Sequence, residues 1–425
     1  MFTLVTQAWL VSKRFLFLFL YHYERSNDVS DILNELKNHQ VWLDFLNYKL
    51  DKQHLSRKDA KRLTDFVNNK EYKSITDRIT NSDFCFNPPI KRSINKTGTT
   101  KKRVIYTYNE AESMVLKVIT FLLYRYDHKI SDNCYSFRKN ISARTAINKI
   151  IMTEDINNLY CLKLDISNYF NSIPADNLCV ILDKFISDDP CLCEFLKNLL
   201  LADIAIEDGV QIRENRGAMA GTPISPFLAN IYLSALDNHY SDIPYFRYSD
   251  DIIIFLPDLE SCRINLEFIK KYLRLNGLSL NEDKVSIIKP HETWEFLGIS
   301  YKEGVIDLSN ITKTKIQAKI KRKAHALYRW RLRKDATFEQ TAKVFIRVFN
   351  KKFFDETDEN SFTWSRWFFP MINTDITLKK IDDYLIQYIR YLYKGRHYKG
   401  NYKITYEQIK ALGFRSLVNE YYKTK

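Results

Sequence analysis

The sequence predicts an α+β fold in which a small antiparallel sheet lies between helical N- and C-terminal regions. Apolar residues recur at helical spacing before about residue 80 and again after Ile311. Between these regions, short runs of aromatic and β-branched residues alternate with turn formers, as strands and hairpins do. With 425 residues, 45% of them apolar, the chain is long enough to bury a sizeable core.

The composition indicates a polyanionic partner. Lys and Arg number 65 and Asp and Glu 51, which gives a net charge of +14. The 10 Gly and 10 Pro exclude collagen-like and linker-rich classes. The seven cysteines form no CxxC pair, so we expect neither a zinc site nor disulfides. This cysteine usage is typical of a reducing compartment, and we expect a cytoplasmic protein.

Residues 1–80 are expected to form a helical N-terminal extension. Their longest apolar run, Phe15–Tyr21, is much shorter than the roughly 20 residues that a membrane helix needs. No small-residue cleavage site follows it, so a signal peptide is not expected either. We therefore expect no membrane association and interpret the run as a helix face that packs on the body. The helical pattern is carried by Ile32, Leu33, Leu36, Trp42, Phe45, Leu46 and Leu50.

Residues 81–305 carry the predicted sheet. Residues 87–102 contain Pro and Gly among basic residues and are expected to form a loop or an irregular hairpin. The apolar stripe of residues 110–125 predicts a buried helix. Strands are expected at Tyr160–Leu164, Tyr245–Tyr248, Ile252–Phe255 and, with Gly298 inside a strand pair, Trp294–Tyr301.

Three carboxylates stand where strands end or turn. Asp165 follows a buried strand, and Asp250 and Asp251 lie at the tip of a hairpin. Burying three carboxylates together is costly unless cations neutralise them. Two Mg²⁺ ions roughly 3.5–4 Å apart would do so and would support phosphoryl transfer. Alone, an Asp-Asp pair is also typical of a solvated turn, but the surrounding pattern favours a metal site.

A glycine-rich turn lies between these acids. Gly217, Gly221 and Pro223 allow close backbone approach, and Ser225-Pro226 opens a helix that is expected to reach Asp237. A glycine-rich turn before a helix is suited to a nucleotide or a template backbone. By itself this signal is moderate.

The order of these motifs along the chain resembles the palm of a reverse transcriptase. The motifs are the acid-ended strand, the glycine-rich turn, the Tyr-Ser-Asp-Asp hairpin and the Phe-Leu-Gly strand. The resemblance covers about residues 101–301. It implies a right-hand polymerase with fingers, palm and thumb, and an RNA-directed DNA polymerase that takes an RNA template and dNTPs and makes DNA. It also implies that Asp165, Asp250 and Asp251, with the Ile166 carbonyl, hold two Mg²⁺ ions.

The resemblance assigns roles to further residues. Arg103 would pair with the incoming triphosphate, and Arg138 would lie near the nucleotide or template. Phe170 would exclude a ribose 2′-hydroxyl, and Lys284 would protonate pyrophosphate. Arg103 and Lys284 could instead be ordinary solvated bases, and Phe170 could be a core residue.

Two further matches concern the template and the primer. Phe296-Leu297-Gly298 resembles the primer grip. Ala220-Gly221 stands where the family usually has Gln-Gly, so the amide that normally contacts the nucleotide or template is absent.

Residues 306–425 are expected to form a basic thumb and a C-terminal RNA-binding region. Residues 311–352 hold 14 Lys and Arg against Asp335 and Glu339. Lys315, Lys319 and Arg322 would then lie along a phosphate backbone. The rings predicted to stack on unpaired RNA are Tyr391, Tyr393, Tyr398 and Tyr402, which alternate with Lys394, Arg396, Lys399 and Lys403. The alternative is a solvated helix end with its tyrosines buried.

The C-terminal third separates possible subclasses. We find no spaced acids of an RNase H domain, no HNH nuclease cysteines and no retron VTG signature. Residues 363–372, 381–385 and 412–422 resemble bacterial defence-associated reverse transcriptases, most closely class 2. That subclass implies antiviral activity and an associated non-coding RNA as template.

Three other functions are alternatives to this interpretation. A maturase-like, non-catalytic RNA-binding protein would not need all three acids. A retron-type enzyme is a second alternative. An RNA-dependent RNA polymerase is disfavoured by Tyr248-Ser249 and by Phe170. The primer, the template and the oligomeric state stay open.

Overall fold

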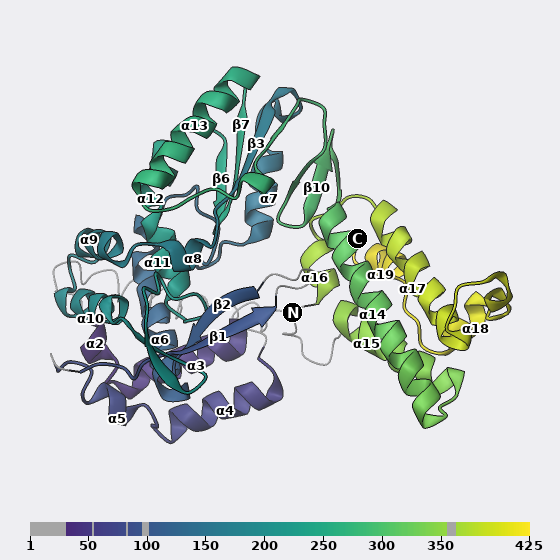
Figure 1. Ribbon diagram of the computed structural model, residues 1–425, viewed down its shortest axis with the longest axis horizontal. Helices are drawn as coiled ribbons and strands as arrows, with labels where there is room; N and C mark the ends of the chain where they lie inside the picture. Colours follow the sequence, from purple (N-terminus) through teal and green to yellow (C-terminus); the bar gives the residue numbers. More distant parts are fainter. Residues whose placement is uncertain (1–30, 53–54, 82–83, 96–101, 355–362) are drawn as a thin grey trace, which may run out of the picture.

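The computed structural model describes residues 31–52, 55–81, 84–95, 102–354 and 363–425 (Figure 1). The apolar run Phe15–Tyr21 lies outside the described residues. Helices and small sheets alternate in the first two thirds of the chain, and helices dominate the last third. The predicted α+β fold class is therefore confirmed.

The N-terminal helices pack on the body and share its core. They are α2 (Ile32–Glu35), α3 (His39–Lys52), α4 (Arg57–Asn68) and α5 (Lys73–Thr76). The predicted buried helix is α6 (Glu110–Leu122), which continues into the 3-10 helix η1 (Leu123–Lys129). Trp42 of α3 stacks on Tyr72 with ring centroids 3.9 Å apart, and both are buried. One apolar cluster runs from Ile32 to Leu280, so these helices do not form a separate core.

The first sheet contains the predicted hairpin of residues 87–102. Strands β1 (Ile90–Asn95) and β2 (Lys102–Thr107) pair antiparallel, with Ile90 opposite Thr107. Strands β4 (Ile204–Glu207) and β5 (Val210–Arg213) extend it in the order β2-β1-β4-β5.

The second sheet is the predicted central one. Its strands are β3 (Tyr160–Asp165), β6 (Tyr245–Tyr248), β7 (Asp251–Leu256) and β8 (Ser286–Ile288), in the order β6-β7-β3-β8 and all antiparallel. The helices of this part of the chain are α7 (Ala143–Ile151), α8 (Tyr169–Ser172), α9 (Ala175–Phe185), α10 (Pro190–Leu201), α11 (Ser225–Tyr232), α12 (Ser234–His239) and α13 (Leu259–Leu275). Of these, α7 packs on β6 and α13 packs on β3 and β7. The helix expected to reach Asp237 is interrupted at Leu233, where α11 ends and α12 begins.

The third sheet leads into the helical C-terminal region. Strands β9 (Trp294–Phe296), β10 (Ile299–Lys302) and β11 (Val305–Leu308) form an antiparallel meander. The helices that follow are α14 (Asn310–Lys334), α15 (Phe338–Phe354), α16 (Trp364–Phe368), α17 (Ile376–Lys394), α18 (Tyr406–Ala411) and α19 (Leu417–Lys423). These helices and the meander share a second apolar cluster, which also takes in Phe246 and Phe255.

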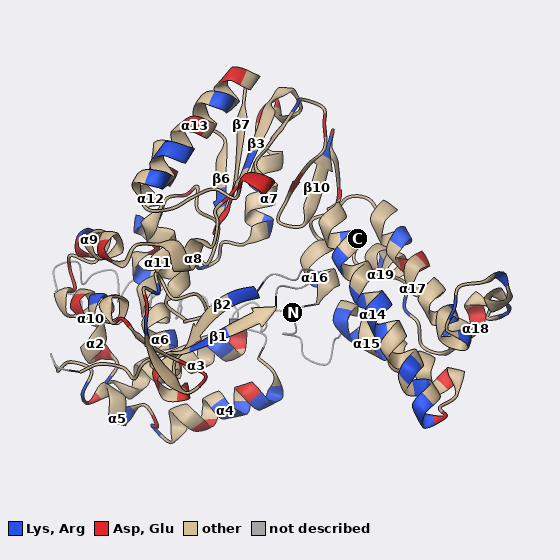
Figure 2. Cartoon of the chain, viewed as in Figure 1, with Lys and Arg blue, Asp and Glu red and all other residues tan. Residues whose placement is uncertain are grey.

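Charge is distributed unevenly over these parts. Lys and Arg gather along α14 and α15 (Figure 2), as the local excess of basic residues predicts. In the part of the chain that the structure describes, no helix is long and apolar enough to cross a membrane. All seven cysteines lie in that part, and each is a free thiol.

Candidate active site

The three predicted acids meet at one edge of the central sheet. Asp165 ends β3 and Asp251 begins β7, and the two are directly opposite in the antiparallel register. The Ile166 backbone N–H donates to the Asp250 carbonyl at 3.0 Å, which ties the hairpin turn to the end of β3. Strand register therefore brings together Asp165 and Asp251, which are 86 positions apart in the sequence.

Burial and mutual repulsion disfavour the charged forms of two of these acids. Burial raises the pKa of Asp250, and the nearby Asp165 carboxylate adds to the shift. Burial, together with the charges of Asp250 and Asp165, raises the pKa of Asp251 to about 6. A cation bound between them would stabilise the carboxylates against both effects.

Asp165 is held by groups from the segment before β8. The Lys284 ammonium donates to Asp165 Oδ1 at 2.5 Å, and the Asn281 amide donates to Oδ2 at 3.3 Å. Burial of Lys284 lowers its pKa, but the hydrogen bond to Asp165 and the nearby carboxylates outweigh this effect and raise it. Lys284 therefore stays an ammonium next to the acids.

These residues fit divalent metals by chemistry. Carboxylate and carbonyl oxygens are the ligands that Mg²⁺ prefers. Among the described residues, no three His, Cys, Asp or Glu side chains already converge on one point as a metal cluster. The raised pKa values of Asp250 and Asp251 are the observation that favours cation binding there.

A pocket of about 490 Å³ lies over Asp250 and Asp251. Arg103 of β2 and Phe170 of α8 line it, and Arg103 is close enough to lower the pKa of Asp250. Phe170 is half-buried, so it borders the pocket and also packs on the core. The remaining lining residues are Ile94, Ile105, Phe137, Ala220, Gly221, Thr222, Ser225, Pro226, Tyr248, Ser249 and Leu297. We call this the catalytic pocket.

Phe137 is a pocket residue that sequence reasoning missed. Its φ is +55°, and 47% of its surface is exposed. Its ring lies 6.3 Å from those of Phe170 and Tyr248, centroid to centroid. The sequence did show an aromatic residue directly before Arg138, but the role near the nucleotide was given to Arg138 and not to Phe137.

The glycine-rich turn packs against the protein's own backbone. A Cβ on Gly217 would lie 2.7 Å from the Phe170 carbonyl oxygen, and the φ of Gly217 is +56°. Asn171 completes this joint, because its Oδ1 accepts from Ala220 N at 2.8 Å and its Nδ2 donates to Val104 O at 3.1 Å. The close approach predicted for Gly217 is therefore real, but its partner is α8 and not a ligand.

The rest of the turn lies between two cavities. Gly221, with φ +101°, packs on β2 and borders the catalytic pocket. Pro223 faces a different cavity, behind the turn. Ser225 is buried, and its hydroxyl donates to Thr222 O at 2.9 Å. This hydroxyl proton is therefore used within the turn and is not offered to the catalytic pocket. Ala220 lines the pocket with a methyl group at the position where the family usually has an amide.

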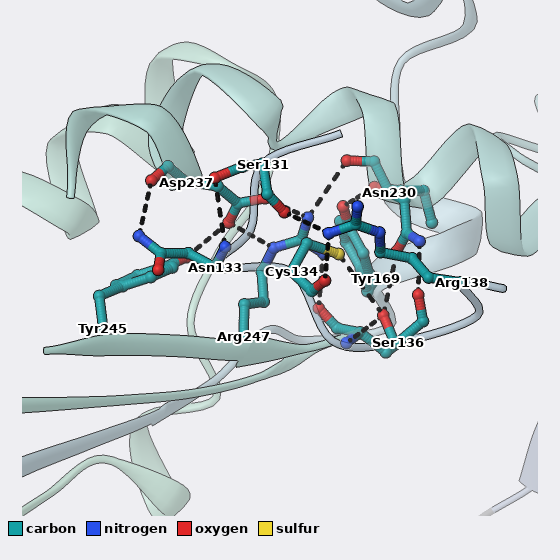
Figure 3. Close-up of polar contacts among 12 residues, drawn as sticks. Ser131, Asn133, Cys134, Ser136, Arg138, Tyr169, Asn230, Asp237, Tyr245 and Arg247 are labelled. Carbon is teal, nitrogen blue, oxygen red and sulfur yellow. Dashed lines mark hydrogen bonds and ion pairs between the residues drawn. The ribbon is translucent and has the colours of Figure 1, made fainter. Parts of the chain in front are cut away.

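A buried polar network holds the hairpin that carries Asp250 (Figure 3). Arg247 and Asp237 form a fully buried ion pair with Nε–Oδ1 at 2.7 Å. Arg247 also donates to Ser249 O at 3.2 Å, and the Ser249 N–H donates to Ser136 Oγ at 2.9 Å. Ser249 has a φ of +62°, a conformation that a non-glycine residue rarely adopts. The two hydrogen bonds hold its carbonyl and its N–H in that conformation.

The network also joins distant segments of the chain. Asn230 of α11 accepts from Ser136 Oγ at 3.0 Å and donates to the Ser136 carbonyl at 2.6 Å. Tyr245 donates to Asp237 at 3.0 Å. Sequence reasoning missed this network, although a charged residue inside the aromatic run of β6 was a usable signal.

The Arg138 side chain, which the resemblance places near the nucleotide or template, is buried in the protein. Its side chain is 5% exposed and pairs with Asp127 at 3.2 Å. It also donates to the backbone carbonyls of Ser131, Cys134 and Asp127. These bonds tie together the 127–138 segment, and within it Phe137, not Arg138, lines the catalytic pocket.

The structure places the three residues of the Phe296-Leu297-Gly298 segment in different surroundings. Phe296 is 1% exposed and belongs to the second apolar cluster. The Gly298 carbonyl accepts from Ser309 N at 2.9 Å and from Thr312 Oγ1 at 3.0 Å, which anchors α14. Leu297, with φ +50°, is the residue that lines the catalytic pocket.

The predicted RNA-binding residues all lie in the helical C-terminal region. On α14, Lys315 and Arg322 are exposed and Lys319 is half-buried. Burial and the charge of Lys319 lower the pKa of Lys352 on α15, which indicates crowded positive charge.

The predicted tyrosine series divides into exposed and buried rings. Tyr398 is 39% exposed and Tyr402 64%. The Arg396 guanidinium lies 4.9 Å from the Tyr398 ring, and that of Arg390 lies 4.7 Å from Tyr402. Tyr391 is buried instead and stacks on His325.

Comparison with known proteins identifies the domain that carries these acids. Residues 94–301 match the family described as "Reverse transcriptase (RNA-dependent DNA polymerase)". These residues form a reverse transcriptase domain, as the motifs predict. The match ends at Tyr301, before α14.

Two curated Saccharomyces cerevisiae proteins are similar to this chain. The "Putative COX1/OXI3 intron 1 protein" is 25% identical over 248 residues, which cover 45% of this chain and 30% of that protein. The "Putative COX1/OXI3 intron 2 protein" is 24% identical over 323 residues, which cover 60% of this chain and 36% of that protein. The chain thus spans about a third of the length of these relatives.

A solved structure, the apo telomerase from Candida tropicalis, is more remotely similar. It has a TM-score of 0.44 and 11% identity, over 80% of this chain and 69% of that one.

Proposed function

We propose that this protein is an RNA-directed DNA polymerase that adds dNTPs to a primer on an RNA template. The observation that carries the proposal is the meeting of Asp165, Asp250 and Asp251 beneath the catalytic pocket, inside a reverse transcriptase domain. Partly buried acids with raised pKa values are typical of sites that bind cations or transfer protons.

The acids would hold two Mg²⁺ ions, with the Ile166 carbonyl as a further ligand. When bound, such ions lower the pKa of the attacking hydroxyl and neutralise the developing charge on phosphate. Lys284 would hold Asp165 until a cation is bound and then give a proton to the leaving pyrophosphate. Its raised pKa supports the first part of this role, because the group is charged at neutral pH.

Arg103 and Phe170 would select the incoming nucleotide. Arg103 borders the pocket from the β1–β2 hairpin and would pair with the triphosphate. Phe170 would exclude a ribose 2′-hydroxyl by its volume, and Phe137 packs beside it. In Phe170→Ala protein, rNTP use should therefore rise relative to dNTP use; an unchanged ratio would make Phe170 a core residue only.

The C-terminal region would bind the RNA. Exposed cations of α14 suit phosphates, and Tyr398 and Tyr402, each with an arginine over its ring, suit unpaired bases. We assign residues 306–425 to the thumb and RNA-binding region, residues 81–305 to fingers and palm, and residues 1–80 to an N-terminal extension.

We further propose that the enzyme acts in bacterial antiviral defence and copies an associated non-coding RNA in the cytoplasm. The C-terminal sequences that resemble class 2 enzymes support the defence role, and the free cysteines support the location. Sequencing the nucleic acid that co-purifies with the protein tests this. One dominant RNA, with DNA complementary to it, is expected; a random set of cellular RNAs would contradict the proposal.

A second candidate function is binding of an intron RNA without DNA synthesis. It is suggested by the two yeast relatives, which are named as intron proteins. All three acids are present here, which a protein that only binds RNA would not need.

A primer-extension assay separates the two functions. The wild-type protein should extend a DNA primer on RNA with Mg²⁺ and dNTPs. Asp250→Ala with Asp251→Ala should abolish extension and keep RNA binding, since metal ligation depends on these carboxylates. Extension by the double variant would refute the site, and no extension by the wild type with any primer would favour RNA binding alone.

A further inference from the structure

A second cavity lies on the other side of the glycine-rich turn. It has a volume of about 310 Å³ and is bordered by α3, α6, η1 and the turn. Its lining residues are Tyr48, Lys49, Ser113, Lys117, Thr120, Phe121, Tyr124, Gly221 and Pro223. We call it the α3–α6 pocket. Its size is at the lower end of small-ligand pockets and suits one nucleotide, not a duplex.

The charge in this pocket is positive. Lys49 and Lys117 both line it, and none of the described residues that line it is acidic. Burial, together with the charge of Lys117, lowers the pKa of Lys49 to about 8. The two ammonium groups repel each other, and an anion placed between them would stabilise the charged form of both.

Aromatic rings form the rest of the wall. The Tyr48 ring lies 5.0 Å from that of Phe121 and 6.3 Å from that of Tyr124, centroid to centroid. All three residues are only half-buried, so ring surface faces the cavity. Cations and rings in one small cavity are the combination that binds the phosphate and the base of single-stranded nucleic acid.

The position of the pocket indicates which strand could enter it. Gly221 lines both the α3–α6 pocket and the catalytic pocket, so a strand that crosses the turn passes from one to the other. In Figure 1, α3 and α6 lie at the lower left, whereas β10 and α14 lie at the right. The product duplex would leave toward the basic α14, so the strand on the opposite side is the one not yet copied.

We propose that the α3–α6 pocket binds a nucleotide of the unpaired template, on the 5′ side of the base being copied. Lys49 and Lys117 contact its phosphate, and its base stacks on the ring wall of Tyr48, Phe121 and Tyr124. This proposal rests on the proposed polymerase function. It gives the N-terminal helix α3 a role in template binding that the sequence motifs do not assign to it.

Binding measured without dNTPs tests this site separately from catalysis. The probes are primer–template duplexes of equal duplex length, with template 5′ overhangs of zero to eight or so nucleotides. Wild-type affinity should rise by roughly tenfold once the overhang is long enough to reach the pocket, because a stacked base with its phosphate contributes about that much. Lys49→Gln with Lys117→Gln should remove this increment and leave the affinity for the blunt duplex unchanged.

A matched control is Lys58→Gln with Lys61→Gln, which removes the same charge from exposed positions on α4. It should keep the overhang increment. An increment that both double variants lose equally would indicate a general charge effect and would overturn the proposal. Equal wild-type affinity for the overhang duplex and the blunt duplex would also overturn the proposal. A third contrary result would be a pocket that binds free AMP while the Lys49→Gln, Lys117→Gln protein keeps the overhang increment.

Primer extension by the same wild-type preparation tells the two proposals apart. If it extends the primer but shows no overhang increment, only the pocket assignment fails. If it shows the increment but extends no primer under any condition, the polymerase assignment fails and the pocket remains an RNA site.

Discussion

The hairpin that carries Asp250 and the basic helix α14 use charged residues in opposite ways. At the hairpin, Arg247 and Asp237 are fully buried and paired with each other and with backbone groups. On α14, Lys315 and Arg322 are exposed, and among the described residues they have no acidic partner. Charge at the hairpin therefore fixes geometry, whereas charge on α14 is available to a ligand. Substitutions in the first region should change stability, and those in the second should change only salt-dependent binding.

The largest effect is expected from Asp237→Ala. It leaves the Arg247 guanidinium buried without its carboxylate, and breaking a buried pair in this way costs about 3–5 kcal/mol. The free energy of unfolding, measured by urea titration, should fall by that amount. Lys315→Gln is the comparison and should leave it unchanged. A cost below about 1 kcal/mol for Asp237→Ala would mean that water reaches Arg247, and the contrast between the regions would weaken.

A pH-dependent effect of up to about 3 kcal/mol is expected at Asp251. Its pKa in the folded protein is about 6, against an ordinary value of 3.8, so the folded state binds this proton more tightly than the unfolded state. Without Mg²⁺, the stability cost of the charged carboxylate is present above pH 6 and is relieved as the pH falls toward 4. Asp251→Asn should therefore be more stable than the wild type at pH 7.5.

At pH 5 about half of this difference should remain, because the folded wild-type carboxyl is then largely protonated but the unfolded one is still ionised. Thermal unfolding in EDTA at both pH values measures this difference. Added Mg²⁺ should stabilise the wild type at pH 7.5 and have little effect on Asp251→Asn. Equal stability of the two proteins at both pH values would show that Asp251 is solvated and would weaken the argument for cation binding.

A smaller effect, about 1–2 kcal/mol, is expected from Ser136→Ala. The substitution removes the acceptor of the Ser249 N–H and the donor to Asn230, but it leaves the Arg247–Asp237 pair in place. Because Ser249 directly precedes Asp250, the rate of nucleotide addition should fall while the KM for dNTP stays near the wild-type value. Single-turnover extension measures the two quantities. A raised KM with an unchanged rate would place the effect in the nucleotide site instead.

The same contrast explains what the sequence could predict. Asp165, Asp250 and Asp251 were predictable because each stands at a strand end, and antiparallel pairing brings strand ends together. The basic character of α14 was predictable from local composition alone. The Arg247 network was not, because Ser136 and Asp237 approach Arg247 and Ser249 only after the chain has folded.

The family resemblance indicated which segments border the catalytic pocket, but it did not indicate which side chain of each segment lines it. Arg138 and Phe296 lie within a residue of pocket residues, but their side chains point into the protein. Phe137 and Leu297 border the pocket instead, each with a positive φ. A motif fixes which segment comes near the acids. Which of its side chains faces them depends on the local backbone, which a motif does not encode.

The smallest effect on folding, and the one that isolates the basic helix, is expected from Lys315→Gln with Lys319→Gln and Arg322→Gln. These side chains make no described ion pairs, so the free energy of unfolding should not change measurably. Each cation that contacts a phosphate of single-stranded RNA contributes about 0.7 to the slope of log affinity against log salt. Loss of three such contacts should lower that slope by roughly 2, and it should do so equally for cognate and scrambled RNA because phosphate contacts carry no sequence information.

Tyr398→Ala with Tyr402→Ala is the matched comparison, since it removes exposed rings but no charge. It should keep the slope and weaken cognate RNA most, by about 1–3 kcal/mol for each lost stacked base. Fluorescence anisotropy with both RNAs at several salt concentrations measures all of these quantities. If the triple variant kept the wild-type slope, α14 would face solvent in the complex, and the comparison between a buried, structural charge network and an exposed, ligand-binding one would no longer hold.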